Sequence, residues 1–173
     1  LEPLANLIWL QQIKEPAEEL ARAYVSEEKQ VPSAEEAVAG ARDILAERIS
    51  DQADYRSYIR KITMDRGMIA SSAKDGEAQS VYEMYYQYEE LIKRCAGHRV
   101  LALNRGEKEK VLTVKIQAPE EDIIRYLEKQ VITRNNPFTV PILQETIRDS
   151  YDRLIGPAIE REVRSALTEN AEA

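Results

Sequence analysis

Residues 33–49 read SAEEAVAGARDILAERI, and this stretch decides the fold class. Ser33 and Glu36 have the spacing of a capping box, in which the serine hydroxyl and the glutamate carboxylate satisfy free backbone donors at a helix start. The apolar residues behind them recur at helical spacing and predict a buried face made of Ala37, Val38, Ala41, Ile44, Leu45 and Ile49. We therefore expect a helix that begins here and packs one side into a core.

Helical periodicity continues over most of the chain. Further helices are expected over residues 2–13, 18–24, 51–67, 78–95, 98–108, 119–132 and 141–173. Gly156-Pro157 is expected to kink or interrupt the last of them. Residues 111–117 alternate apolar and polar side chains, and residues 68–73 are their candidate partner. The prediction is a mostly α multi-helix array with a small two-stranded β element.

The chain is expected to divide into an N-terminal helical part (1–66), a central part with the strands (67–118) and C-terminal helices (119–173). It starts at Leu1 instead of Met, and its last helix has no stop signal. Both features favour a fragment of a larger intracellular protein in which a further domain follows.

Composition argues against several classes of function. One cysteine, Cys95, and one histidine, His98, are too few for a disulfide framework or for most zinc and di-iron sites. No apolar run approaches the roughly 20 residues of a membrane span. Phosphate-binding glycine loops are absent as well. We expect no catalytic residue, no metal and no cofactor, with Cys95 as a small buried apolar group and His98 as a helix cap or a core histidine.

Charge is unevenly distributed along a chain whose net charge is -7. Residues 93–115 carry a net charge of +5, whereas each of the segments around them is acidic. A basic segment on an acidic protein is what a polyanion would bind, because each neutralised phosphate releases counterions. The other interpretation is a solvated helix face whose bases pair with acids of neighbouring helices. Both stay open, and the candidate phosphate contacts are Lys93, Arg94, Arg99, Arg105, Lys108 and Lys110.

Tyrosines are concentrated in the segment just before the basic one. The residues Val81, Tyr85, Tyr88, Ile92 and Cys95 are spaced alternately by four and three, as on one face of a helix. This spacing favours packing in the core over a second interpretation, in which exposed tyrosines stack on unpaired bases.

Several stretches resemble the Tex family of bacterial transcription accessory proteins. The most specific is HRVLALNRGE at residues 98–107, preceded by YYQY at 85–88. LEPLA at 1–5, GARDILAE at 40–47 and IEREVR at 159–164 also match, in order, over nearly the whole chain. Ala96-Gly97 departs from the Pro-Ser of the family pattern, so the approach to His98 is expected to differ locally.

The resemblance implies a non-catalytic helical scaffold of a cytoplasmic protein that binds RNA or DNA and regulates transcription. It places the chain before an RNase H-like domain, so no nuclease activity is expected here. It also implies a helix-turn-helix-like unit, for which residues 16–66 offer three helices. Residues 1–66 have a net charge of -4, so we expect this unit not to read a DNA groove.

Two partner sets follow from the resemblance and from the charge distribution. The first is RNA or DNA, bound through the parent protein and weakly through residues 93–115. The second, as the alternative, is protein: a module that packs on other domains of the parent or on the transcription machinery and makes no nucleic-acid contact of its own. Neither set includes a membrane.

Overall fold

In a computed structural model of the chain, residues 1–26 and 29–173 are described, and they form two compact units. The units consist of residues 1–56 with 121–156 (unit 1) and residues 57–120 with 157–173 (unit 2). Neither unit is a continuous stretch of sequence. The mostly α fold with a small β element is confirmed. The division into parts 1–66, 67–118 and 119–173 stays a prediction.

Unit 1 is built around α3 (Ala34–Ser50), the helix predicted from residues 33–49. Ser33 caps it as predicted, because its hydroxyl accepts a hydrogen bond of 3.2 Å from the backbone N–H of Glu36. The predicted apolar face is buried except for Ile44, which is half-buried. The other elements of unit 1 are α1 (Glu2–Leu10), α2 (Ala17–Ala21), η1 (Arg22–Tyr24), α6 (Glu120–Val131), α7 (Val140–Ser150) and the π-helical turn η4 (Tyr151–Ile155).

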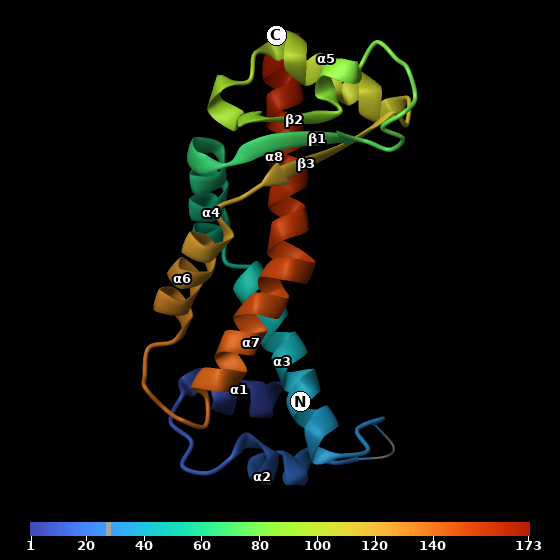
Figure 1. The fold of residues 1–173 in the computed structure, drawn as a ribbon. Coiled ribbons are helices and arrows are strands. Elements are labelled where there is room, and N and C mark those ends of the chain that lie inside the picture. The colour runs from blue at the N-terminus through green and yellow to red at the C-terminus, as the bar shows by residue number, and fades with distance from the viewer. Residues whose placement is uncertain (27–28) are drawn as a thin grey trace. The chain divides into compact units, whose positions relative to one another are not determined.

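The helices α1, α2 and α7 pack against α3, and Figure 1 shows α3 and α7 side by side. A fully buried hydroxyl fixes this pair: Ser150 Oγ donates a 2.6 Å hydrogen bond to the carbonyl of Ala46. At the surface, Arg153 holds Asp149 through two hydrogen bonds of 2.6 and 2.7 Å, which lowers the pKa of that carboxyl.

The predicted interruption at Gly156-Pro157 is visible as a change of helix type. The π-helical turn η4 ends at Ile155, and α8 (Gly156–Glu172) begins directly after it. Proline has no N–H to donate and its ring clashes with the preceding turn, so the regular hydrogen-bond ladder cannot run through Pro157. The π-turn absorbs the mismatch, and Pro157 takes a first-turn position of α8, where it is tolerated.

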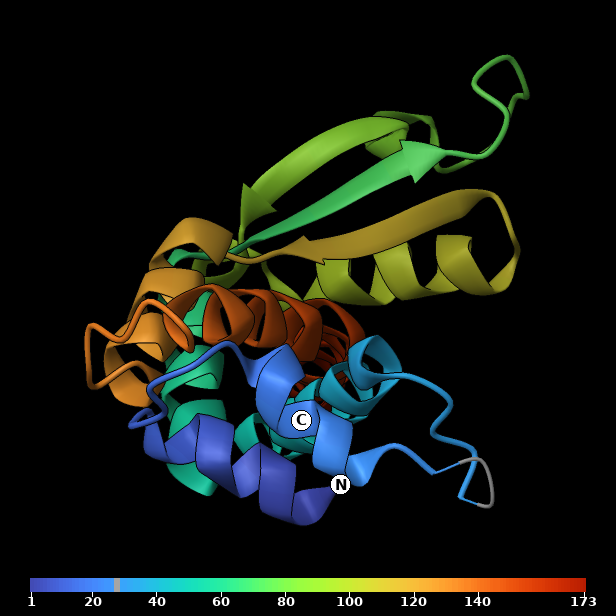
Figure 2. The same cartoon turned by 90° about the horizontal axis from the view of Figure 1, so that it is seen from below.

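Unit 2 contains a three-stranded antiparallel sheet in the order β2-β1-β3. Its strands are β1 (Met68–Ala73), β2 (Gln87–Leu91) and β3 (Leu112–Gln117). The inner face buries Ile69, Leu112 and Val114. Helix α5 (Gly97–Lys108) packs on β3, and Figure 2 shows β3 between β1 and α5. The helix α4 (Ala53–Arg66) leads into β1.

The sheet has three strands, not the predicted two, because the helix expected over residues 78–95 does not form. Its place is taken by η2 (Glu83–Tyr85), β2 and η3 (Ile92–Arg94). Tyr85 is buried as expected, but Val81 of the same predicted face is 86% exposed. Tyrosine suits a half-buried strand at least as well as a helix, and pairing with β1 satisfies the backbone groups of β2 that face β1, those of Tyr88 and Glu90.

Candidate nucleic-acid interface

The structure separates the basic segment into two groups. Lys93 and Arg94 lie in η3, before the start of α5, whereas Arg105 and Lys108 lie in its last turn. The twelve residues of α5 span about 18 Å, at about 1.5 Å per residue. The basic side chains at the two ends of the helix therefore act on a polyanion as separate contacts.

Arg99, between the two groups, is held by a carboxylate. Its Nη2 and Nε atoms lie 2.7 and 3.0 Å from the two carboxylate oxygens of Glu90, which also accepts from the hydroxyl of Tyr88. The Arg99 side chain is 30% exposed, and its ion pair joins the first turn of α5 to β2. This geometry favours a structural role for Arg99, and Glu90 raises the pKa of the guanidinium.

The second group includes a residue that lies outside the basic segment of the sequence. The backbone N–H of Lys74, at the end of β1, donates a 3.0 Å hydrogen bond to the carbonyl of Val111, at the start of β3. Lys74 therefore lies beside Lys110. We call Lys74, Arg105, Lys108 and Lys110 the basic end; all four side chains are exposed, and none has an ion-pair partner in the part of the chain that the structure describes.

The two acids inside the basic segment are bound to other side chains. Glu107 forms a 2.8 Å ion pair with Arg164 of α8, which balances the charge of the Glu107 carboxylate. Glu109 accepts a hydrogen bond from the hydroxyl of Tyr82, and this bond raises the pKa of the tyrosine. The carboxylates are therefore not paired with the lysines of the basic end, although Glu109 keeps its charge close to them.

Lys110 itself adopts a left-handed backbone conformation, with φ of 64°. The N–H of Lys110 bonds to the carbonyl of Glu107, and the N–H of Val111 bonds to that of Gly106. This pair of bonds is the Schellman motif, whose left-handed position usually holds glycine. A lysine here places a positive charge at the helix C-terminus at the cost of backbone strain.

We expect Lys110→Gly to raise the free energy of unfolding of unit 2 by about 1 kcal/mol, because glycine adopts the left-handed conformation without a steric penalty. The midpoint of urea denaturation measures this change. Lys110→Ala is the control: it removes the same side chain but keeps the Cβ, so it should give no increase. An equal gain in both variants would show that strain at Lys110 is not the cause.

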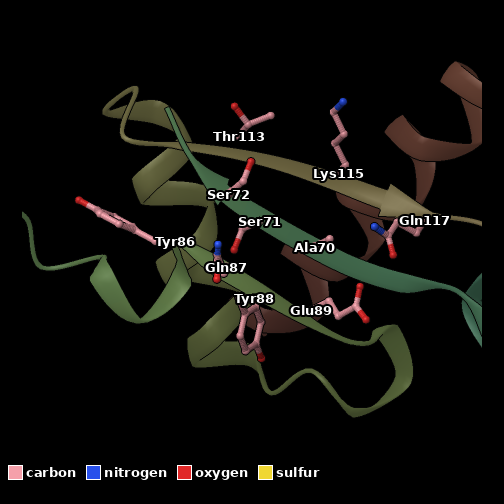
Figure 3. A pocket seen from close by; sticks show the side chains of 10 residues that line it. All are labelled: Ala70, Ser71, Ser72, Tyr86, Gln87, Tyr88, Glu89, Thr113, Lys115 and Gln117. Carbon is pink, nitrogen blue, oxygen red and sulfur yellow. The ribbon is translucent and has the colours of Figure 1, made fainter. Parts of the chain in front are cut away.

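The outer face of the sheet adjoins the basic end and carries polar side chains. A shallow hollow of about 490 Å³ lies on this face (Figure 3). Ser72 pairs with Thr113, and Ala70 pairs with Lys115, so these side chains lie on one face. Small residues on β1 form the floor of the hollow, and longer side chains on β2 and β3 form its sides.

The remaining sequence candidates fall outside any reactive cluster. His98 is exposed in the first turn of α5, and the N-cap of that helix is Ala96, so His98 is neither the predicted helix cap nor a core histidine. Cys95 is half-buried, and burial raises the pKa of its thiol, which disfavours the reactive thiolate. Within residues 1–26 and 29–173, no three His, Cys, Asp or Glu side chains gather as a metal ion would require. None of the described helices is long and apolar enough to span a bilayer.

Comparison with known proteins gives a match over nearly the whole chain. Residues 12–173 match the family model described as Tex central region-like. The chain is 50% identical to the uncharacterized protein YdcI of Bacillus subtilis over 99% of its length, which is 24% of that protein. It is 28% identical to the transcriptional accessory protein Tex of Neisseria gonorrhoeae, over 99% of the chain and 23% of the relative.

A human protein, S1 RNA-binding domain-containing protein 1, is 32% identical over 77% of the chain and 15% of its own length. The chain therefore spans a quarter or less of each of these three relatives. None of the three names designates an enzyme.

Proposed function

Because the chain belongs to the Tex central region-like family, we propose that it is a non-catalytic helical scaffold of a longer, cytoplasmic transcription accessory protein and that it contacts RNA or DNA. The names of two relatives, a transcriptional accessory protein and an S1 RNA-binding domain-containing protein, support a role near nucleic acid. The observation that carries the proposal for this chain is the basic end, with four exposed cations that have no ion-pair partner among the described residues.

The chemistry of the basic end suits phosphate groups. Lysine and arginine neutralise phosphates without reading sequence, and the released counterions supply most of the affinity. Lys93 and Arg94, at the other end of α5, provide a second contact, also without an ion-pair partner within the described ranges. Arg99 is left out of the contact set because Glu90 occupies its guanidinium.

A helix-turn-helix-like unit over residues 16–66 is part of the proposal as a structural element. Helices α3 and α4 are joined by a short connection, with α3 ending at Ser50 and α4 starting at Ala53. The net charge of -4 over residues 1–66 disfavours DNA binding by this unit, so its role here is to support the rest of the scaffold.

The proposal is tested by binding of the 173-residue chain to labelled single-stranded RNA and duplex DNA at low salt. The variant Arg105→Glu/Lys108→Glu should bind about tenfold more weakly than the wild type, because two phosphate contacts become repulsive. The control Lys61→Glu/Lys129→Glu reverses two exposed lysines elsewhere and should keep the wild-type affinity. Equal and negligible binding by wild type and variants would overturn nucleic-acid contact by this chain.

A module that only packs on other proteins is the second candidate, and an apolar hollow of about 410 Å³ in unit 1 favours it. Leu7 and Leu10 line this hollow and are 37% and 58% exposed. If this hollow is a protein contact, the isolated chain should self-associate in light scattering, and Leu10→Lys should abolish the association. A monomer at high concentration would count against this candidate.

A further inference from the structure

The two edge strands of the sheet in unit 2, β3 and β2, differ in the hydrogen bonding of their outward backbone groups. In an antiparallel sheet, alternate residues of an edge strand direct their N–H and C=O groups away from the sheet. On β3 these outward groups are bonded by α8: the N–H of Ile116 donates to Glu160 at 2.8 Å, and the carbonyl of Val114 accepts from Arg164 at 3.4 Å. Two side chains one helical turn apart thus close this edge.

The edge formed by β2 stays open. The N–H of Ile92 bonds to Gly67 and the carbonyl of Tyr86 bonds to Ala73, which fixes the residues of even number as those that face β1. The backbone groups of Gln87, Glu89 and Leu91 therefore point outward. No described residue donates to them or accepts from them. Since buried backbone groups are almost always paired, these groups face solvent.

One charged side chain marks the centre of this open edge. Glu89 is exposed on the outer face and has no ion-pair partner in the described part of the chain. Its direct neighbour on β1 is Ala70, and Lys115 follows on β3, about 10 Å away at two strand spacings. A cation directly opposite Glu89 would have to come from a strand added outside β2 (Figure 3).

We infer that the β2 edge is a docking site for an extended polypeptide segment that places a lysine or arginine opposite Glu89. Backbone groups of Gln87, Glu89 and Leu91 provide the hydrogen bonds of the added strand, and Glu89 provides the preference for a basic side chain. Addition of a strand to an exposed sheet edge is a general mode of peptide recognition, in which main-chain bonds give affinity and alternate side chains give specificity.

A second copy of this chain is a poor occupant of the same edge. The antiparallel register that pairs all five residues of β2 with a second β2 sets Glu89 opposite Glu89. Like charges directly opposite each other destabilise a strand pair. A central charge of this kind is a common protection of edge strands against self-pairing, and it leaves the edge available to a strand of complementary charge.

The test uses the 173-residue chain and a synthetic seven-residue peptide that alternates valine and threonine around a central lysine. Peptide binding is followed by NMR, together with amide hydrogen exchange. The exchange of the outward amides of Gln87, Glu89 and Leu91 should slow on binding, whereas those of Tyr88 and Glu90, already bonded to β1, should change little. A peptide with a central glutamate should bind several-fold more weakly.

Glu89→Lys should invert this preference, and the control Glu83→Lys, an equal change of charge outside β2, should not. No binding of the lysine peptide at millimolar concentration would overturn the inference. So would equal affinity for both peptides, protection of amides away from β2, or dimerisation of the wild-type chain through β2 in sedimentation. None of these outcomes bears on nucleic-acid binding by the basic end.

Discussion

Gly67→Ala is expected to destabilise unit 2 by about 3 kcal/mol, the upper range for a group forced into a packed site. Gly67 joins α4 to β1, and a Cβ on it would lie 2.4 Å from the carbonyl oxygen of Thr63 and 3.2 Å from that of Gln117. Both are backbone atoms, and so cannot rotate away. The Gly67 N–H also bonds to Thr63 at 2.7 Å, so moving the glycine breaks a helix-end hydrogen bond.

Thermal and urea unfolding of the variant measure this loss, with Gly76→Ala as the matched control. Gly76 lies in the loop after β1, and its Cβ would meet no atom within 4 Å. The free energy of unfolding of Gly76→Ala should stay within about 0.5 kcal/mol of that of the wild type. If the two alanine variants were equally stable, the tight junction between α4, β1 and the end of β3 would be contradicted.

Gln11→Ala is expected to destabilise unit 1 by about 4 kcal/mol, because several backbone groups lose their partners together. Gln11 is 4% exposed. Its Nε2 donates to the carbonyls of Trp9 and Val131 at 3.1 and 2.8 Å. Its Oε1 accepts from the N–H groups of Thr133 and Arg134 at 3.0 and 3.2 Å. One amide therefore joins the end of α1 to the segment after α6.

Two further variants separate the parts of this arrangement. Gln11→Glu keeps the acceptor for Thr133 and Arg134 but sets a second, charged acceptor against the carbonyls of Trp9 and Val131, so its loss should be at least as large as that of Gln11→Ala. Gln12→Ala changes an exposed neighbour and should be nearly neutral. Chemical denaturation, followed by a probe in unit 1, ranks the three variants by their free energy of unfolding. A Gln11→Ala variant as stable as Gln12→Ala would show that the amide does not hold this segment.

The elements with a strong local signal could be predicted from the sequence. The Ser33 cap, β1 over residues 68–73 and the helix at 98–108 agree with the structure to within a residue or two. Each has a local cause: a capping residue, a β-rich run before a turn, or an apolar face at helical spacing. Residues 78–95 have the same helical spacing, yet they form two short turns and β2, because pairing of β2 with β1 outweighs this local signal.

The features that could not be predicted depend on contacts between residues distant in the sequence. Gln11 ends α1 in a left-handed conformation, with φ of 59°, where glycine or asparagine is usual. The backbone groups that the Gln11 side chain bonds lie more than a hundred residues away in the sequence, at 131–134. Lys74 joins the basic end only through the register of β1 with β3, and Arg99 is occupied only because β2 presents Glu90. Periodicity and charge counts cannot show any of these.

If the basic end binds nucleic-acid phosphates, the affinity of the chain for RNA depends steeply on salt concentration. The four contacts of the basic end and the two of Lys93 and Arg94 predict that the logarithm of the affinity for single-stranded RNA falls with the logarithm of salt concentration with a slope of about -4, at about 0.7 per phosphate. Arg105→Glu/Lys108→Glu should flatten this slope by about a third. An identical slope in wild type and variant would contradict the binding of phosphates by the basic end.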